Sequence, residues 1–241
     1  MYKRGLIERF SIITAIAAII IFMLPVGSRS NTSTAPKDID GFFRALVGDW
    51  VGSVEQYTGG VRAANKYFHA VTKQTSSDTY QSTFTYYRID KKTHAGVMIG
   101  TTTMTTKISP DGSATNTMVG KGEVFINPRT LKQETHELYE VLRMSAPGAM
   151  EGKGGGKVSV LGLAMDAGKS GKVSHQTSTW KLNNDTLNIT QRLKASFHVL
   201  FFNMKYEIED RLEAKPGDDV LGLMKDAVNN TEPEESTIFY P

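Results

Sequence analysis

The sequence predicts an all-β protein in which roughly ten antiparallel strands follow one another as a meander. From Trp50 onward, apolar and polar residues alternate with period two, as they do in half-buried strands. Several runs are rich in β-branched residues, which disfavour helices. Turn-forming Gly, Pro, Asn and Asp separate most of the runs at short spacing. A sheet of this kind closes into a barrel or folds into a sandwich.

The segment 1–28 is predicted to be an export signal sequence. Basic residues, Lys3 and Arg4 among them, precede an uncharged apolar run of 16 residues from Ser11 to Val26. This run is shorter than the roughly 20 residues of a transmembrane helix, and cleavage is expected after Ser28. The mature chain is then periplasmic or secreted. An uncleaved segment that anchors the protein is the alternative, and membrane contact is expected only through this segment.

The remaining elements follow in order after a polar linker at 29–38. A short helix is predicted before Trp50, because Phe42, Phe43 and Leu46 share one helical face. Ten strands are predicted at 50–57, 65–73, 78–90, 95–109, 114–126, 135–144, 157–165, 172–182, 185–195 and 197–213. The glycine-rich stretch 147–156 and the segment 166–172 are predicted as connections. The barrel domain is therefore expected over 39–213, and a C-terminal helix and acidic tail over 214–241.

Charge and cysteine content exclude several functions. The chain has 28 basic and 25 acidic residues, but without the signal segment the balance is 25 to 24. A nearly neutral folded domain gives no support for nucleic-acid binding. The absence of cysteine from the sequence excludes disulfides, thiolate metal sites and a cysteine nucleophile. The oligomeric state is not determined by these features.

Two stretches resemble catalytic motifs but fail on spacing and context. Gly168, Lys169 and Ser170 are typical of a phosphate-binding loop, yet the preceding glycine is one position too far away and a strand follows. His136 and Glu137 begin like a zinc-protease signature, but Glu140 stands where the second histidine belongs. No metal ligand or catalytic residue is therefore assigned. The sequence also has no nucleophile–base or carboxylate pair at informative spacing, so an enzyme is the less favoured class.

Aromatic and methionine side chains are the candidate lining of a ligand cavity. They are chosen because they alternate on single faces of the predicted strands: Phe68, Tyr80, Phe84, Tyr86, Met98 and Met104. Such a lining suits a small hydrophobic molecule such as a lipid. The alternative is that these side chains simply fill a core. A cavity above about 300 Å³ would favour ligand binding, and perturbed polar groups inside it would favour an enzyme.

The stretch Gly48-Asp49-Trp50 resembles the Gly-x-Trp signature that opens the barrel of lipocalins and other calycin-like proteins. The resemblance implies that Trp50 closes one end of the barrel and that an arginine, Arg211 or secondarily Arg192, covers it. The lipocalin disulfide cannot form here, and ten strands bring the chain closer to the fatty-acid-binding and nitrobindin-like barrels. Nitrobindin-like proteins hold haem through a histidine, so the resemblance makes His198 the candidate haem ligand.

These observations together predict an exported, lipocalin-like β-barrel that binds a small hydrophobic ligand in its cavity. The alternative is an envelope protein-interaction or structural module with a filled core. A haem-binding barrel and a barrel-cavity enzyme are the remaining hypotheses. No cofactor is predicted from the residues themselves, and haem enters only through the resemblance.

Overall fold

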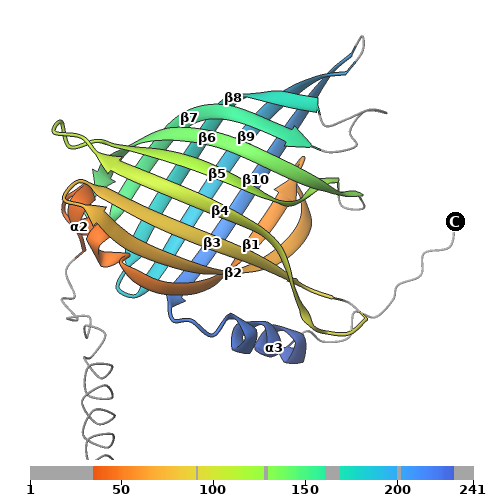
Figure 1. Ribbon diagram of the computed structural model, residues 1–241, viewed down its shortest axis with the longest axis horizontal. Helices are drawn as coiled ribbons and strands as arrows, with labels where there is room; N and C mark the ends of the chain where they lie inside the picture. Colours follow the sequence, from red (N-terminus) through yellow and green to blue (C-terminus); the bar gives the residue numbers. More distant parts are fainter. Residues whose placement is uncertain (1–34, 91, 128–129, 161–168, 200–201, 231–241) are drawn as a thin grey trace, which may run out of the picture. The chain divides into compact units, whose positions relative to one another are not determined.

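The computed structural model describes residues 35–90, 92–127, 130–160, 169–199 and 202–230 of the 241-residue chain. The elements in these residues are α2 (Ile39–Ala45), β1 (Gly48–Thr58), β2 (Val61–Ser76), β3 (Thr79–Ile89), β4 (Gly96–Ile108), β5 (Ala114–Asn127), β6 (Thr130–Ala146), β7 (Ala149–Val160), β8 (Lys169–Asn183), β9 (Thr186–Val199), β10 (Phe202–Pro216) and α3 (Val220–Asn230). Each strand pairs antiparallel with the next, and β10 pairs with β1, which closes the barrel (Figure 1). The predicted ten-stranded antiparallel barrel with a helix before it and a helix after it is confirmed.

Period two along the strands sorts side chains between the inside and the outside of the barrel. On β1, every second residue from Trp50 to Gln56 is buried, while the residues between them are more exposed. Because a strand directs successive side chains to opposite faces, the alternating sequence specifies which face turns inward. The register between β1 and β10, with Gln56 opposite Asp210, then fixes which inward side chains meet.

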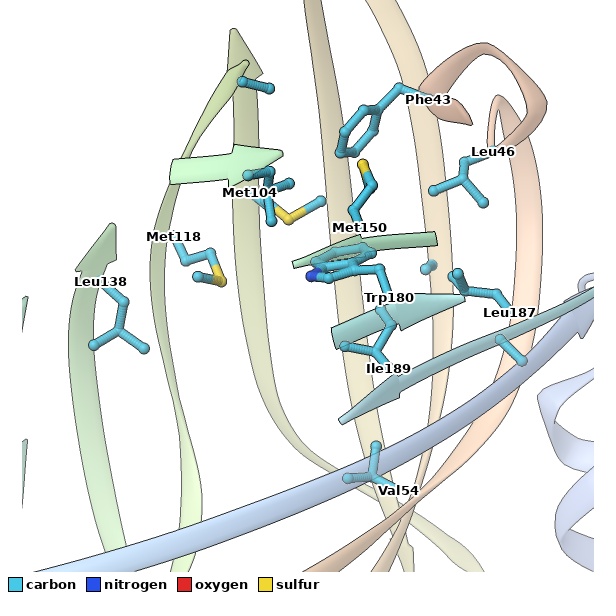
Figure 2. Close-up of a cluster of buried hydrophobic side chains, with 14 of the residues drawn as sticks. Phe43, Leu46, Val54, Met104, Met118, Leu138, Met150, Trp180, Leu187 and Ile189 are labelled. Carbon is cyan, nitrogen blue, oxygen red and sulfur yellow. The ribbon is translucent and has the colours of Figure 1, made fainter. Parts of the chain in front are cut away.

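Helix α2 covers one end of the barrel. Asp38 caps it by accepting a hydrogen bond from the backbone N–H of Gly41 at 2.6 Å. The ring of Phe43 lies 5.8 Å from that of Tyr80 and 6.2 Å from that of Trp180, within the range of aromatic packing. Figure 2 shows part of the resulting core, which includes Phe43, Leu46, Met104, Met150, Trp180 and Leu187. The half of the barrel next to α2 is therefore filled with side chains.

Helix α3 lies against the outside of the barrel (Figure 1). Val220 and Met224 of this helix form a small buried cluster with Tyr67 of β2. Strand β10 continues to Pro216, past the predicted end of the barrel domain at residue 213. Neither helix in the described residues is long and apolar enough to cross a membrane. The predicted signal sequence and the acidic tail lie outside the described residues, as does most of the linker.

The glycine-rich stretch 147–156 is a strand for most of its length, so its prediction as a turn is wrong. Only Pro147 and Gly148, with φ +70° at the glycine, form the turn, and β7 begins immediately after them. A Cβ at Gly154 would lie 1.8 Å from a backbone oxygen of β6, and a Cβ at Gly156 would lie 2.2 Å from another. The glycines therefore allow β7 to approach β6 closely. Lys169, predicted to lie in a connection, is instead the first residue of β8.

Candidate functional site

A cavity of about 140 Å³ lies inside the barrel, partly open to solvent, on the side of the core away from α2. Its apolar wall comes from inward-facing residues of several strands, among them Val54, Leu138, Val158, Ile189, Ile208 and Leu212. Its polar wall includes Gln56, Lys66, Tyr86, Glu134, His136 and Asp210. The cavity is therefore apolar over much of its surface, with titratable groups gathered on the remainder.

Asp210 is the most perturbed carboxyl group in the cavity. It lies opposite Gln56 in the pairing of β1 with β10 and accepts a hydrogen bond from that side chain. Its Oδ1 atom is buried and has no hydrogen-bond partner among the described residues. Burial raises the pKa of Asp210 to about 6, against the lowering effects of Lys66 and His136. A carboxyl group that titrates near pH 6 is suited to binding a cation or to exchanging a proton.

Lys66 and Tyr86 lie beside Asp210 in the polar wall. The Nζ of Lys66 donates a hydrogen bond to the backbone oxygen of Glu123 at 2.9 Å, which ties the ammonium group to β5. Burial raises the pKa of Tyr86, and the charge of Asp210 adds to the effect. The phenol of Tyr86 is therefore neutral at physiological pH and presents a hydroxyl group rather than a charge.

His136 and Glu134 enter the cavity together from β6. The Nδ1 of His136 lies 3.4 Å from a carboxylate oxygen of Glu134, and its Nε2 lies 3.2 Å from the hydroxyl of Thr102. A Cβ at Gly120 would lie 2.7 Å from that Nε2, so the absence of a side chain there makes room for the imidazole. The two residues are spaced i, i+2 on a strand and so share its inner face. This spacing is the signal that the sequence analysis missed.

A second polar cluster surrounds Glu140, which lies on β6 two residues after the cavity-lining Leu138. The carboxylate is 1% exposed and accepts hydrogen bonds from Ser178 at 2.5 Å, Asn116 at 3.0 Å and Gln176 at 3.4 Å. Burial raises the pKa of Glu140, although these hydrogen bonds act in the opposite direction. The Oε1 atom of Gln176 is buried without a partner among the described residues. This cluster is a second polar region of the interior, and Glu140, Ser178, Asn116 and Gln176 are not among the residues that line the cavity.

Of the six predicted lining residues, Tyr86 is the one that lines the cavity. Its ring belongs to an aromatic group with Phe68 and Phe84, at centroid distances of 6.2 Å from each. Tyr80 lies under α2, where its hydroxyl donates to Asp40 at 2.6 Å. Whether any of these side chains contacts a ligand stays a prediction.

The two predicted methionines lie in different environments. Met104 is 2% exposed in the core, whereas Met98 is 62% exposed. The pairing of β3 with β4 shifts between Tyr86 and Tyr87, so that Ile99 has no partner in the register and faces the cavity. Such an irregularity reverses the alternation of the strand beyond it. Met98 therefore faces away from the cavity and is not placed to line it.

Trp50 and Arg211 do not form the stacked pair that the family resemblance implies. Trp50 is 3% exposed, and its indole N–H donates to the backbone oxygen of Leu46 at 2.9 Å. Gly48 is the first residue of β1, and its φ of +116° allows the chain to turn from α2 into the barrel. Arg211 lies on the outer face, where its guanidinium is 4.6 Å from the ring centre of Tyr57. Arg211 is directed outward because it neighbours the inward Asp210, and strand residues alternate.

The second-choice arginine is also exposed on the outer face. Arg192 Nε donates to Glu209 at 2.8 Å. His198, the candidate haem ligand, belongs to β9 by its backbone pairing, but its side chain lies outside the described residues. Among the residues that the structure describes, no group of three or more His, Cys, Asp or Glu side chains is arranged to hold a metal ion.

Comparisons with known proteins leave the family open. No protein-family model matches the chain, and no curated protein matches it. The crystal structure of Rv2717c from M. tuberculosis is similar over 73% of this chain and 98% of that chain, with 13% identity and a TM-score of 0.45. At that level of similarity, nothing about the function of this chain follows from the match.

Proposed function

We propose that this chain is an exported barrel protein that binds a small, largely apolar molecule in its cavity. The observation that carries the proposal is the division of the cavity into an apolar wall and a cluster of polar groups around Asp210. Binding sites for small molecules are typically concave and mostly apolar, with a few polar groups that fix the orientation of the ligand. The cavity has this composition.

Perturbed polar groups inside the cavity are also the feature expected of a barrel-cavity enzyme, which is the second candidate function. These groups support binding because they are unfavourable for the stability of the empty barrel. Burial of an aspartate that lacks a partner for Oδ1 opposes folding, and an apolar residue there would avoid that cost. Carboxyl groups with perturbed pKa values cluster at functional sites. The half next to α2 is filled mainly with apolar side chains, and the buried carboxylate of Glu140 accepts three hydrogen bonds.

The cavity is smaller than the roughly 300 Å³ that would by itself favour ligand binding over a filled core, and its size favours a small ligand over a lipid. Its volume of about 140 Å³ is close to that of an engineered cavity of about 150 Å³ that binds benzene. Drug-sized ligands occupy pockets of roughly 300 Å³ or more. A ligand with one ring or a short chain therefore fits the cavity, and a lipid would leave most of its chain outside.

Calorimetric titration with benzyl alcohol tests the proposal, together with a variant that fills the cavity. Ala195 lines the cavity and is 6% exposed, so the ring of Ala195→Phe would occupy the space of the ligand. We expect measurable binding to the native protein and none to this variant. Ser196→Phe is the matched control, because Ser196 is exposed on the same strand and should leave binding unchanged.

Equal binding by the native protein and a folded Ala195→Phe variant would overturn the proposal, as would failure of every small apolar probe to bind. Ala195→Leu is the smaller substitution if the phenylalanine variant does not fold.

The proposal of export rests on the N-terminal segment of the sequence. N-terminal sequencing of the protein recovered from the cell envelope or medium tests it, and a chain found only in the cytoplasm would contradict it.

A further inference from the structure

We propose that the cavity selects a ligand carrying a protonated amine, whose ammonium group binds the carboxylate of Asp210. This inference rests on the proposed function and adds the chemical class of the ligand. It follows from three features of the cavity: an unpartnered acceptor atom, a carboxylate without an ion-pair partner, and an apolar wall beside them.

The interior has a surplus of hydrogen-bond acceptors. In the described part of the chain, the buried side-chain polar atoms without a partner are Oδ1 of Asp210 and Oε1 of Gln176. Both are acceptors, and the Gln176 amide is oriented by the contact of its Nε2 with Glu140. The residues that line the cavity include Asp210 but not Gln176, so a ligand in the cavity must supply an N–H or O–H donor to Oδ1 of Asp210.

The carboxylate of Asp210 favours a cation over an anion. Three carboxylates, Glu123, Glu134 and Asp210, line the cavity together with two lysines, Lys66 and Lys121. Glu123 pairs with Arg88, and Glu134 lies beside His136. The charge of Lys66 lowers the pKa of Asp210, but its ammonium donates a hydrogen bond to a backbone oxygen of β5. No ion pair found among the described residues includes Asp210. An ammonium group would provide the ion-pair partner that Asp210 lacks among the described residues, whereas a carboxylate ligand would be repelled by Asp210.

An ammonium group also forms a stronger hydrogen bond with Oδ1 of Asp210 than a neutral donor does. A charge-assisted hydrogen bond is roughly twice as strong as a neutral one, and its strength increases away from water. The ring of Tyr86 lines the cavity beside Asp210, and its neutral π face also attracts cations. The apolar wall formed by residues such as Ile208 and Leu212 would then receive the hydrocarbon part of the ligand.

Three probes of nearly equal size separate charge from shape: benzylamine, benzyl alcohol and benzoate. Calorimetric titrations at pH 8 keep the carboxylate of Asp210 ionised and the amine largely protonated. We expect benzylamine to bind the native protein at least about 10-fold more tightly than benzyl alcohol, and benzoate to bind more weakly than either.

Asp210→Asn supplies the decisive variant, because it removes the charge and keeps the shape. We expect benzylamine affinity to fall about 10-fold or more while benzyl alcohol affinity changes less than about 3-fold. Glu209→Gln is the matched control. Glu209 is the chain neighbour of Asp210, but it faces outward and pairs with Arg192 and Arg211. This control should leave the affinities for all three probes unchanged.

The outcomes distinguish this inference from the proposed function. Binding of benzyl alcohol or benzoate with no preference for benzylamine would overturn the inference and leave a cavity that binds small molecules. An unchanged benzylamine affinity in folded Asp210→Asn would also overturn it. Failure of all three probes to bind would overturn both.

Discussion

Replacement of Asp210 by asparagine should stabilise the protein at neutral pH. Burial raises the pKa of this carboxyl from 3.8 to about 6. Between those pH values the folded state binds more protons at Asp210 than the unfolded state does. The contribution of this residue to the unfolding free energy therefore falls as the pH rises through that interval, and it stays low above it.

The magnitude follows from the two pKa values. At about 1.36 kcal/mol per pH unit, the change from 3.8 to about 6 corresponds to about 3 kcal/mol at pH 7 or above. Asparagine resembles the protonated aspartic acid in shape and carries no charge. Asp210→Asn should therefore be close to neutral near pH 4 and stabilising by about 1–3 kcal/mol at pH 8.

Urea unfolding followed by tryptophan fluorescence measures this difference at a series of pH values from 4 to 8. The comparison of variant with native protein is needed because Asp78, Asp90 and Asp111 have lowered pKa values and make the opposite contribution. A stability difference that is absent or negative at pH 8 would refute the assignment of Asp210 as a destabilising buried carboxylate.

The adjacent residue provides a control of opposite sign. Partial burial raises the pKa of Glu209, but hydrogen bonds from Arg211 and Arg192 outweigh this effect and hold the pKa below its usual value. Ionised Glu209 therefore stabilises the folded state above its unfolded pKa, and that contribution is lost as the pH falls. Glu209→Gln should destabilise the protein slightly at pH 8, where Asp210→Asn stabilises it.

The remaining predictions concern unfolding free energies and are checked by the same urea titrations. Trp50→Ala should cost about 3–5 kcal/mol, because it empties a buried site next to α2, and a loss under about 1 kcal/mol would reject that role. Glu140→Ala should cost about 2–4 kcal/mol by leaving buried donors without an acceptor, and an unchanged stability would show that water replaces the carboxylate. Gly156→Ala should cost at least about 2 kcal/mol, because φ is +146° and the new Cβ would meet a backbone oxygen; a neutral effect would contradict the close approach of β6. Met98→Ser should stay within about 0.5 kcal/mol, since the side chain is 62% exposed, and a larger loss would place it in the core.

Period two and turn residues suffice to predict the antiparallel meander of about ten strands because both signals are local. They leave a barrel and a sandwich both open, and the barrel follows from the resemblance at Gly48 and Trp50. The alternation around Trp50 and Val54 marks an inner face whatever strand lies beside it. The errors occur where a neighbouring strand decides the outcome. Gly154 and Gly156 look like turn residues until the backbone of β6 is beside them, and Met98 changes sides because of an irregularity that leaves no mark in the sequence.

The polar part of the cavity is harder to predict because its members come together only when the barrel closes. Asp210 meets Gln56 through the pairing of the last strand with the first. One signal is nevertheless present in the sequence. Asp210 lies two residues from both Ile208 and Leu212, so the alternation of the strand places a carboxyl group on an apolar inner face. The predicted lining consists instead of aromatic residues and methionines, and of those Tyr86 lines the cavity.

Native mass spectrometry tests the existence of a bound ligand most directly. The protein is recovered without detergent from the cells that make it, and small molecules extracted from it are identified by their masses. We predict one stoichiometric small molecule that carries an amine and is absent from the Ala195→Phe variant prepared in the same way. A bare protein mass, together with failure to take up added benzylamine or benzyl alcohol, would contradict ligand binding and favour a structural module.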